Sequence, residues 1–304
     1  MMIEADRAAT SAEQIAEYVG GMLTESTGGT ERAKLLLRVT ATAVGSAVLL
    51  VLYYTLLSRM GVTTSIPALA VILLASTLSS IAGFAFSAIC GAMLLHIMAD
   101  PVRTVEVLMV CSIAIQSFSV VMLWRDIGWK ALSRFVLGGV AGLPIGVWLL
   151  LHLGAGTFRQ AIGGLLTAYV AYGLLKRPVT VKSSSTAIDA AVGWVGGIIG
   201  GLAAFPGAAV TIWCGMRGWD KQLQRGIYQP YILIMQVMAL GIIGYMREGQ
   251  PHMDALSLAT LQFVPAAMLG TWFGLNIFKR ISDRTFTLTI NALLLLSGIG
   301  LLAQ

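Results

Sequence analysis

Apolar stretches of about eighteen or more residues, with few charges, recur along the whole of this 304-residue chain. Each is long enough to cross roughly 30 Å of hydrocarbon as an α-helix, which satisfies its own backbone hydrogen bonds. Charged residues make up 11% of the chain, against about 25% in soluble domains, and hydrophobic residues make up 57%. The sequence therefore predicts an all-α polytopic membrane protein and excludes a soluble globular domain.

The apolar segments divide into an opening helix and two sets of four. A polar tail at 1–34, which has no signal-peptide pattern and is expected in the cytoplasm, precedes the opening transmembrane helix at 35–57. The first set spans 66–176, a polar linker covers 177–187, and the second set spans 188–304. The segments are expected near 66–98, 103–125, 132–153 and 156–176, and again near 188–217, 222–247, 254–276 and 283–303.

The two sets repeat one pattern of lengths and residues. A long first segment is followed by three ordinary ones in each set, and Gln116 of the first matches Gln236 of the second. The triplet GVW at 146–148 likewise matches GTW at 270–272. Internal duplication is the economical explanation.

The first segment of each set is too long for one crossing and is interrupted by small residues or proline, at Ala82 and Gly83 and at 205–207. Each segment is either a kinked single helix or a hairpin, and basic residues distinguish the two because they gather on the cytoplasmic side. With hairpins and a cytoplasmic N-terminus, each inner loop carries three basic residues and each outer loop carries one. The inner residues are Arg125, Lys130, Arg134, Lys176, Arg177, Lys182, Arg217, Lys221, Arg225, Lys279, Arg280 and Arg284; the outer ones are Arg59, Arg103, Arg159 and Arg247.

A hairpin plus three spans crosses the membrane an odd number of times, so the second repeat is expected upside down relative to the first, with the C-terminus outside. Inverted repeats with discontinuous helices are typical of secondary transporters, whose site lies at the membrane midplane between the repeats. We therefore expect a multi-pass protein of the cell (inner or plasma) membrane.

The breaks are the first candidate site. Each starts a half-helix whose unpaired N–H groups and positive dipole end attract anions. The residues expected there are Gly83, Ser87, Phe205, Pro206 and Gly207. The alternative is that glycine and proline merely break the helices so that neighbours can pack.

Polar residues near the breaks extend this candidate site. Gln116 and Gln236 lie near the centres of their helices and can donate hydrogen bonds to an anion, although an interhelical hydrogen bond is an equal alternative. Arg217, Lys221 and Arg225 could form the inner mouth of an anion pathway, although positive charge is expected at that face anyway. Glu106 and Arg103 flank the outer end of their helix, where either a surface ion pair or a gate fits.

No pattern in the sequence indicates enzyme chemistry, a metal, a cofactor or nucleic-acid binding. The three cysteines lie inside apolar runs, the three histidines are far apart, and no nucleotide-binding loop is present. The span centres carry no acidic residue, so no carboxylate proton relay or cation site is indicated there.

The chain from about Ile66 onward resembles the sulfite exporter TauE/SafE family of membrane permeases. The resemblance is carried by GFAFSAICGAMLL, GLPIGVWLLLHLGAGTFRQAIGGLLTAYVAYGLL, GGLAAFPGAAV, RGWDK followed by Arg225 and Gln229, and ISDRTFTLTINALLLLSGIGLL. It implies transport of sulfite, sulfonates or related organosulfur anions without ATP, with Gln229 among the site residues.

Other functions compatible with the sequence are an anion channel, a structural or regulatory membrane subunit and, less well supported, an intramembrane enzyme. The substrate, the direction of transport, the coupling ion (H+ or Na+) and homo-oligomer formation are left open.

Overall fold

The computed structural model describes residues 52–56, 58–59, 61, 65–82, 85–98, 100–175, 185–247, 258–277, 295, 298–299 and 301–302. The chain divides into two compact units, Met1–Thr55 and Leu56–Gln304. In the first unit the described residues 52–55 are helical. The predicted tail at 1–34, most of the opening helix at 35–57 and nearly all of the linker at 177–187 lie outside the described residues.

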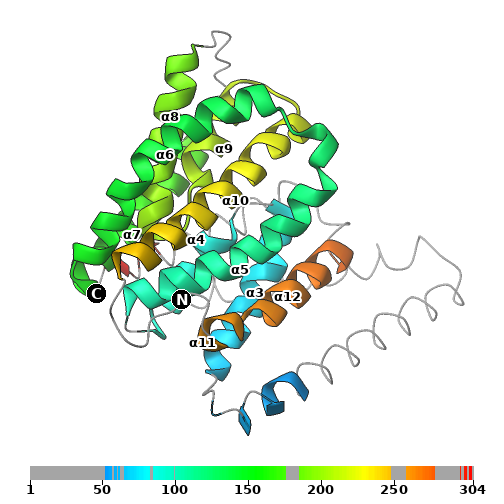
Figure 1. Ribbon diagram of the computed structural model, residues 1–304, viewed down its shortest axis with the longest axis vertical. Coiled ribbons are helices and arrows are strands. Elements are labelled where there is room, and N and C mark those ends of the chain that lie inside the picture. The colour runs from blue at the N-terminus through cyan, green and yellow to red at the C-terminus, as the bar shows by residue number, and fades with distance from the viewer. Residues whose placement is uncertain are drawn as a thin grey trace, which may run out of the picture. The chain divides into compact units, whose positions relative to one another are not determined.

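All regular structure in the described part of the second unit is helical (Figure 1). The helices are α3 (Ile66–Ala82), α4 (Phe86–Leu94), α5 (Pro101–Met122), α6 (Trp129–His152), α7 (Ala155–Leu175), α8 (Thr186–Ala203), α9 (Gly207–Met216), α10 (Lys221–Met246), α11 (Leu258–Leu261) and α12 (Val264–Ile277). By length and composition, α5, α6, α8 and α10 can each cross a membrane. The predicted all-α membrane architecture is confirmed in this part of the chain.

The helices α5 and α10 begin with the same capping arrangement. The carboxylate Oδ1 of Asp100 accepts hydrogen bonds from the N–H groups of Val102 and Arg103 at 2.9 and 3.4 Å. Asp220 caps α10 in the same way, 3.0 and 2.9 Å from the second and third N–H groups. The caps are 120 residues apart (220 − 100), as are Gln116 and Gln236 (236 − 116), so the duplicated pattern extends to the helix starts.

The segment 186–216 is a helical hairpin. The helix α8 ends at Ala203 and is followed by Ala204, whose backbone is left-handed (φ 54°) and whose N–H donates to the carbonyl of Gly200 at 3.0 Å. The indole of Trp213, near the end of α9, donates to Oδ1 of Asp189, in the first turn of α8, at 2.8 Å. The end of α9 has therefore returned to the start of α8. In the first half, α3 and α4 are separated at 83–85 and pack against each other; Gly83 itself lies outside the described residues.

Glycines bring α6 and α8 into backbone contact. A Cβ on Gly138, Gly142 or Gly146 would overlap a carbonyl oxygen of α8, those of Ala190, Trp194 and Ile198 respectively. The partners advance by four residues together, so the helices run parallel. Such four-residue spacing of glycines is typical of close helix packing in membranes.

The helices α3 and α12 make a second contact of the same kind. A Cβ on Gly270 would meet the carbonyl of Leu73, and one on Gly274 would meet that of Thr77. The third span of each half thus packs against the first helix of the other half, because α6 pairs with α8 and α12 pairs with α3.

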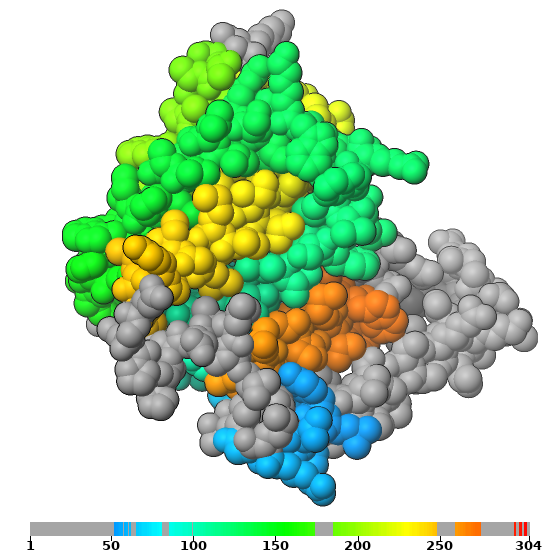
Figure 2. All heavy atoms as spheres, in the orientation of Figure 1, coloured from blue at the N-terminus to red at the C-terminus, as the bar shows by residue number. Residues whose placement is uncertain are grey.

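The helices α5 and α10 run antiparallel. At one end, Nη1 of Arg247 at the close of α10 lies 3.4 Å from Oε1 of Glu106 in the second turn of α5. At the other end, a Cβ on Gly226 would overlap the carbonyl of Asp126. On the face shown in Figure 2, α10 lies between α6 and α5, consistent with its contacts to both.

The segment expected as one span near 254–276 is interrupted. The helix α11 ends at Leu261, and α12 begins at Val264, directly before Pro265. Proline lacks an N–H and is favoured in the first turn of a helix, which accounts for a fresh start there. Gln262, in the gap, donates to the carbonyl of Ala259 at 2.8 Å.

Candidate functional site

A cavity of about 380 Å³ lies between α5 and α10 and reaches the break between α3 and α4. Ten of its fifteen lining residues are polar, although 57% of the chain is hydrophobic. The polar residues are Ser79, Ser80, Ser112, Gln116, Ser119, Asp126, Gln222, Arg225, Gln229 and Thr271. A polar hollow inside an apolar bundle is a strong indication of a ligand path.

Two predicted glutamines line this cavity from different helices. Gln116 comes from the middle of α5 and Gln229 from α10, and they are 3% and 1% exposed. The side-chain oxygen of Gln229 has no hydrogen-bond partner among the described residues. A buried amide without its full set of partners is unfavourable unless a ligand or water completes it. The amide can present either its NH₂ or its oxygen to the cavity.

The mouth of the cavity carries one cation and one anion. Arg225 lies one turn before Gln229 on α10 and donates a hydrogen bond to Tyr228. Asp126 lies across the mouth, exposed to solvent, and the described ion pairs include none between it and Arg225. The guanidinium therefore keeps capacity for an oxyanion.

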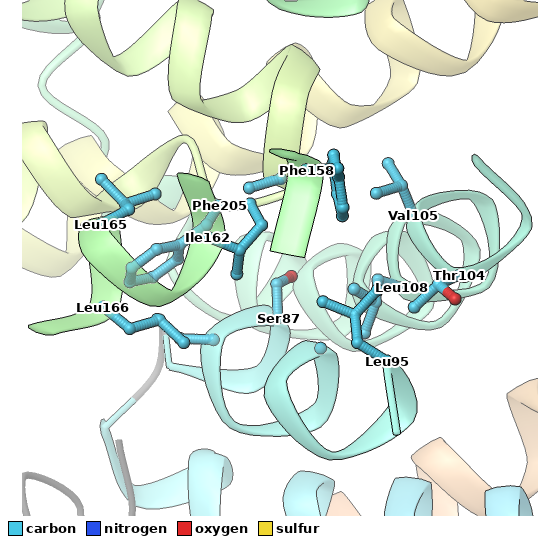
Figure 3. A pocket seen from close by; sticks show the side chains of 13 residues that line it. Ser87, Leu95, Thr104, Val105, Leu108, Phe158, Ile162, Leu165, Leu166 and Phe205 are labelled. Carbon is cyan, nitrogen blue, oxygen red and sulfur yellow. The ribbon is translucent and has the colours of Figure 1, made fainter. Parts of the chain in front are cut away.

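A second, smaller cavity of about 20 Å³ lies between α4 and the second break (Figure 3). Ser87, in the first turn of α4, and Phe205, in the second break, both line it. The hydroxyl of Ser87 points into the cavity among apolar side chains of α5 and α7. This volume holds about one water molecule. Ser87 lines this small cavity and Gln116 lines the large one, and the first turn of α4 lies between the two cavities.

The second break is closed by packing. The amide Nε2 of Gln236 donates to the carbonyl of Ala204 at 3.0 Å, and Gln236 is 1% exposed. Pro206 and Gly207 are buried, and Pro206 lies against Gly196 and Gly200 of α8. Gln236 thus holds the break, whereas its repeat partner Gln116 lines the open cavity.

The three predicted mouth cations separate in the structure. Arg217 is 10% exposed; its Nη1 lies 3.5 Å from Oδ1 of Asp189, and its guanidinium lies 4.7 Å from the ring centre of Trp219. Arg134 also approaches Asp189, at 3.4 Å. Lys221 is exposed at the start of α10, and of the three only Arg225 lines the large cavity.

Seven of the ten polar residues that line the large cavity were not predicted from the sequence: Ser79, Ser80, Ser112, Ser119, Asp126, Gln222 and Thr271. Ser112, Gln116 and Ser119 are spaced i, i+4, i+7 on α5, and Gln222, Arg225 and Gln229 are spaced i, i+3, i+7 on α10. Such spacing places polar residues on one face of each helix, a signal that would have found them. The buried acids Glu106 and Asp189 were missed as interior groups because both lie within two turns of a helix start. Within the described residues, no three His, Cys, Asp or Glu side chains are placed to hold a metal ion.

Comparison with known families gives one result. The family model Sulfite exporter TauE/SafE matches residues 68–301. The chain belongs to this family. Membership in the TauE/SafE family, together with the long apolar helices, makes it a multi-pass membrane protein of a transporter family. The match confirms the resemblance found in the sequence, and it begins after the tail and the opening helix. No curated protein and no solved structure gives a match.

Proposed function

We propose that this protein is a secondary transporter of small anions, most naturally sulfite, sulfonates or related organosulfur compounds. Transport proceeds by alternating access at a site between two inverted repeats. The observation that carries the proposal is the polar cavity of about 380 Å³, open at one end of the α5–α10 pair, in a member of a sulfite exporter family.

The helix pairing supports inverted repeats. Equivalent second spans of two inverted copies must run in opposite directions, and α5 and α10 do so. Exchanging the two repeats converts the pair α6 with α8 into the pair α12 with α3, and the helices of both pairs are in contact. The matched caps at Asp100 and Asp220 add a further correspondence.

Charge supports a cytoplasmic opening. The cavity mouth at Asp126 and Gln222 lies at the end of α5 and the start of α10, beside the basic loops that carry Arg125, Lys130 and Lys221. Basic loops face the cytoplasm. At the opposite end Glu106 and Arg247 join the helices and Ile243 is fully buried, so the described molecule corresponds to an inward-open state.

The anion would be held by three kinds of group: a guanidinium, side-chain amides and a helix N-terminus. Arg225 supplies a permanent positive charge that suits an oxyanion, and Gln116 and Gln229 supply amide hydrogens deeper in the cavity. The helix α4, which has no side-chain cap, begins at Phe86 in the cavity wall and offers the positive end of its dipole. The cavity is large enough for a sulfonate with an organic group, whose apolar part would contact Ile115 and Phe118.

Flux into liposomes tests this assignment. Sulfite and a small alkyl sulfonate should exchange through the parent protein with saturable rates, whereas the Gln116→Leu, Gln229→Leu double variant should transport neither. The exposed Lys130→Gln is the matched control, because it removes a cation at the same end away from the cavity. Transport by the double variant at the parent rate would refute the site, non-saturating flux would indicate a channel, and absence of flux in the parent would favour a structural subunit.

A further inference from the structure

Glu106 is a buried carboxylate that is only half satisfied. Its side chain is fully buried (0% exposed) in the second turn of α5. Oε1 lies 3.4 Å from Nη1 of Arg247, whereas Oε2 has no hydrogen-bond partner within the described structure. An ionised carboxylate with an unpaired buried oxygen is costly, and a proton on that oxygen would remove the charge.

The other buried carboxylate in the described helices is a contrasting case. Asp189 is 1% exposed and receives a hydrogen bond from Trp213 as well as the charges of Arg134 and Arg217. Its two oxygens are therefore both engaged and both near a cation. Among the buried acids of the described helices, Glu106 is therefore the one with an unpaired oxygen that a proton could occupy.

The charged surroundings of Glu106 are few. Arg247 faces it from α10, and Arg103 and Asp100 act on it from the start of its own helix. The helices α4, α11 and α12 also pack against α5 and contain no charged residue. The helix α6, with Lys130, Arg134 and His152, and the 3-10 helix Trp124–Asp126, with Arg125 and Asp126, contact α5 too, but none of these groups is among the charges that act on Glu106. Within the described residues, the single link from Glu106 to the facing helix is therefore its ion pair with Arg247.

The position of the Glu106–Arg247 pair links protonation of Glu106 to the separation of α5 and α10. The large cavity is lined by the end of α5 and the start of α10, and the Glu106–Arg247 pair joins the same two helices at their opposite ends. Protonation of Glu106 would cancel its ionic attraction to Arg247, which is 12% exposed at the end of α10. The closed end would then be free to open.

We propose that Glu106 is a proton-binding site, and that binding of one proton from the outer solution releases Arg247 and opens the outer ends of α5 and α10. The inference rests on the proposed alternating-access function. A proton binds more tightly to the outward-open state, so by linkage acidic solution favours that state.

Labelling of one buried position tests the proton site without measuring transport. Ile243 is 0% exposed and lies one turn before Arg247 on the same face of α10, behind the ion pair. An Ile243→Cys variant would be made with the three buried native cysteines replaced by alanine and treated from outside, in proteoliposomes, with a membrane-impermeant thiosulfonate. We expect labelling to be at least about fivefold faster at about pH 5 than at about pH 8, after correction for the thiol's own reactivity at an exposed cysteine.

Variants separate the proton site from a general effect of acid. Glu106→Gln should label fast at both pH values, and Arg103→Gln, which removes a nearby charge but not the pair, should keep the pH dependence of the parent. Equal labelling of the parent at both pH values would overturn the proposal, as would a Glu106→Gln protein that stays protected or still responds to pH. If Glu106→Gln does not fold, the proposal is tested by the pH dependence of labelling in the parent and in Glu106→Asp, which should both respond to pH. If labelling of Ile243→Cys depends on pH but no anion flux is measured, the transport function is refuted and the proton site is not.

Discussion

At the scale of single residues, three buried glutamines differ in what surrounds them. Gln116 and Gln229 line the large cavity, whereas the amide of Gln236 is used by the carbonyl of Ala204. The sequence identified all three, Gln229 through family resemblance, because polar residues stand out in apolar spans. It could not separate a ligand contact from a structural hydrogen bond, since that depends on whether the facing backbone is packed or open.

The hydrogen bond of Gln236 leads to a prediction about stability. Gln236→Leu should lower the free energy of unfolding by about 1 kcal/mol, because the carbonyl of Ala204 loses its donor in a dry interior. Thermal unfolding in detergent would measure this, with Gln160→Leu at an exposed position of α7 as the control. Equal midpoints for Gln236→Leu and the control would contradict the structural role.

At the scale of helices, the packing of α6 on α8 depends on the absence of side chains. Glycines at four-residue spacing are typical of close helix contact, and the structure supplies the partner helix, which lies in the other half of the chain. The helix breaks were predictable because glycine and proline punctuate an otherwise continuous apolar run. The interruption at Gln262 and Phe263 was not predicted, because a single Pro265 within a long apolar segment is compatible with a kinked helix as well.

At this contact, even a substitution that adds one methyl group should lower the stability of the protein. Gly142→Ala places a Cβ on the carbonyl of Trp194 and should destabilise the protein by about 1–3 kcal/mol. In α7, Gly164 has open space around it, so Gly164→Ala should fall within about 1 kcal/mol of the parent, on the stabilising side. Unfolding midpoints of the two alanine variants give the comparison, and a Gly142→Ala protein as stable as Gly164→Ala would argue against the close contact.

The hairpin of α8 and α9 also has a direct test. Ala187 and Lys221, which are exposed just inside α8 and at the start of α10, should both be labelled from the cytoplasmic side when changed to cysteine. Gly156, exposed at the start of α7, should be labelled from the opposite side. A single crossing between 187 and 221 would place those two positions on opposite sides of the membrane.

At the scale of the whole molecule, the apolar segments were enough to predict an all-helical membrane protein, whereas the two inverted halves inferred from duplication and loop charge stay a prediction. The place of the cavity at one end of α5 and α10 could not be predicted from the sequence, because two states of an alternating-access protein would use the same residues and differ by a few contacts. The burial of Glu106 was also beyond the sequence. Its place near a helix end looks like a surface position, and it is buried because helices distant in the sequence, α10 and α12 among them, pack against α5.

The central claim is that the cavity between α5 and α10 binds an anion through Arg225. The most direct measurement is the thermal stability of the purified protein titrated with sulfite and with a small sulfonate, for the parent, Arg225→Gln and Lys130→Gln. At a concentration about one hundred times Kd, a ligand that binds only the folded state adds about 2.7 kcal/mol of stability. We predict that one of these anions stabilises the parent and Lys130→Gln alike and leaves Arg225→Gln unchanged; equal stabilisation of all three, or of none, would contradict the account.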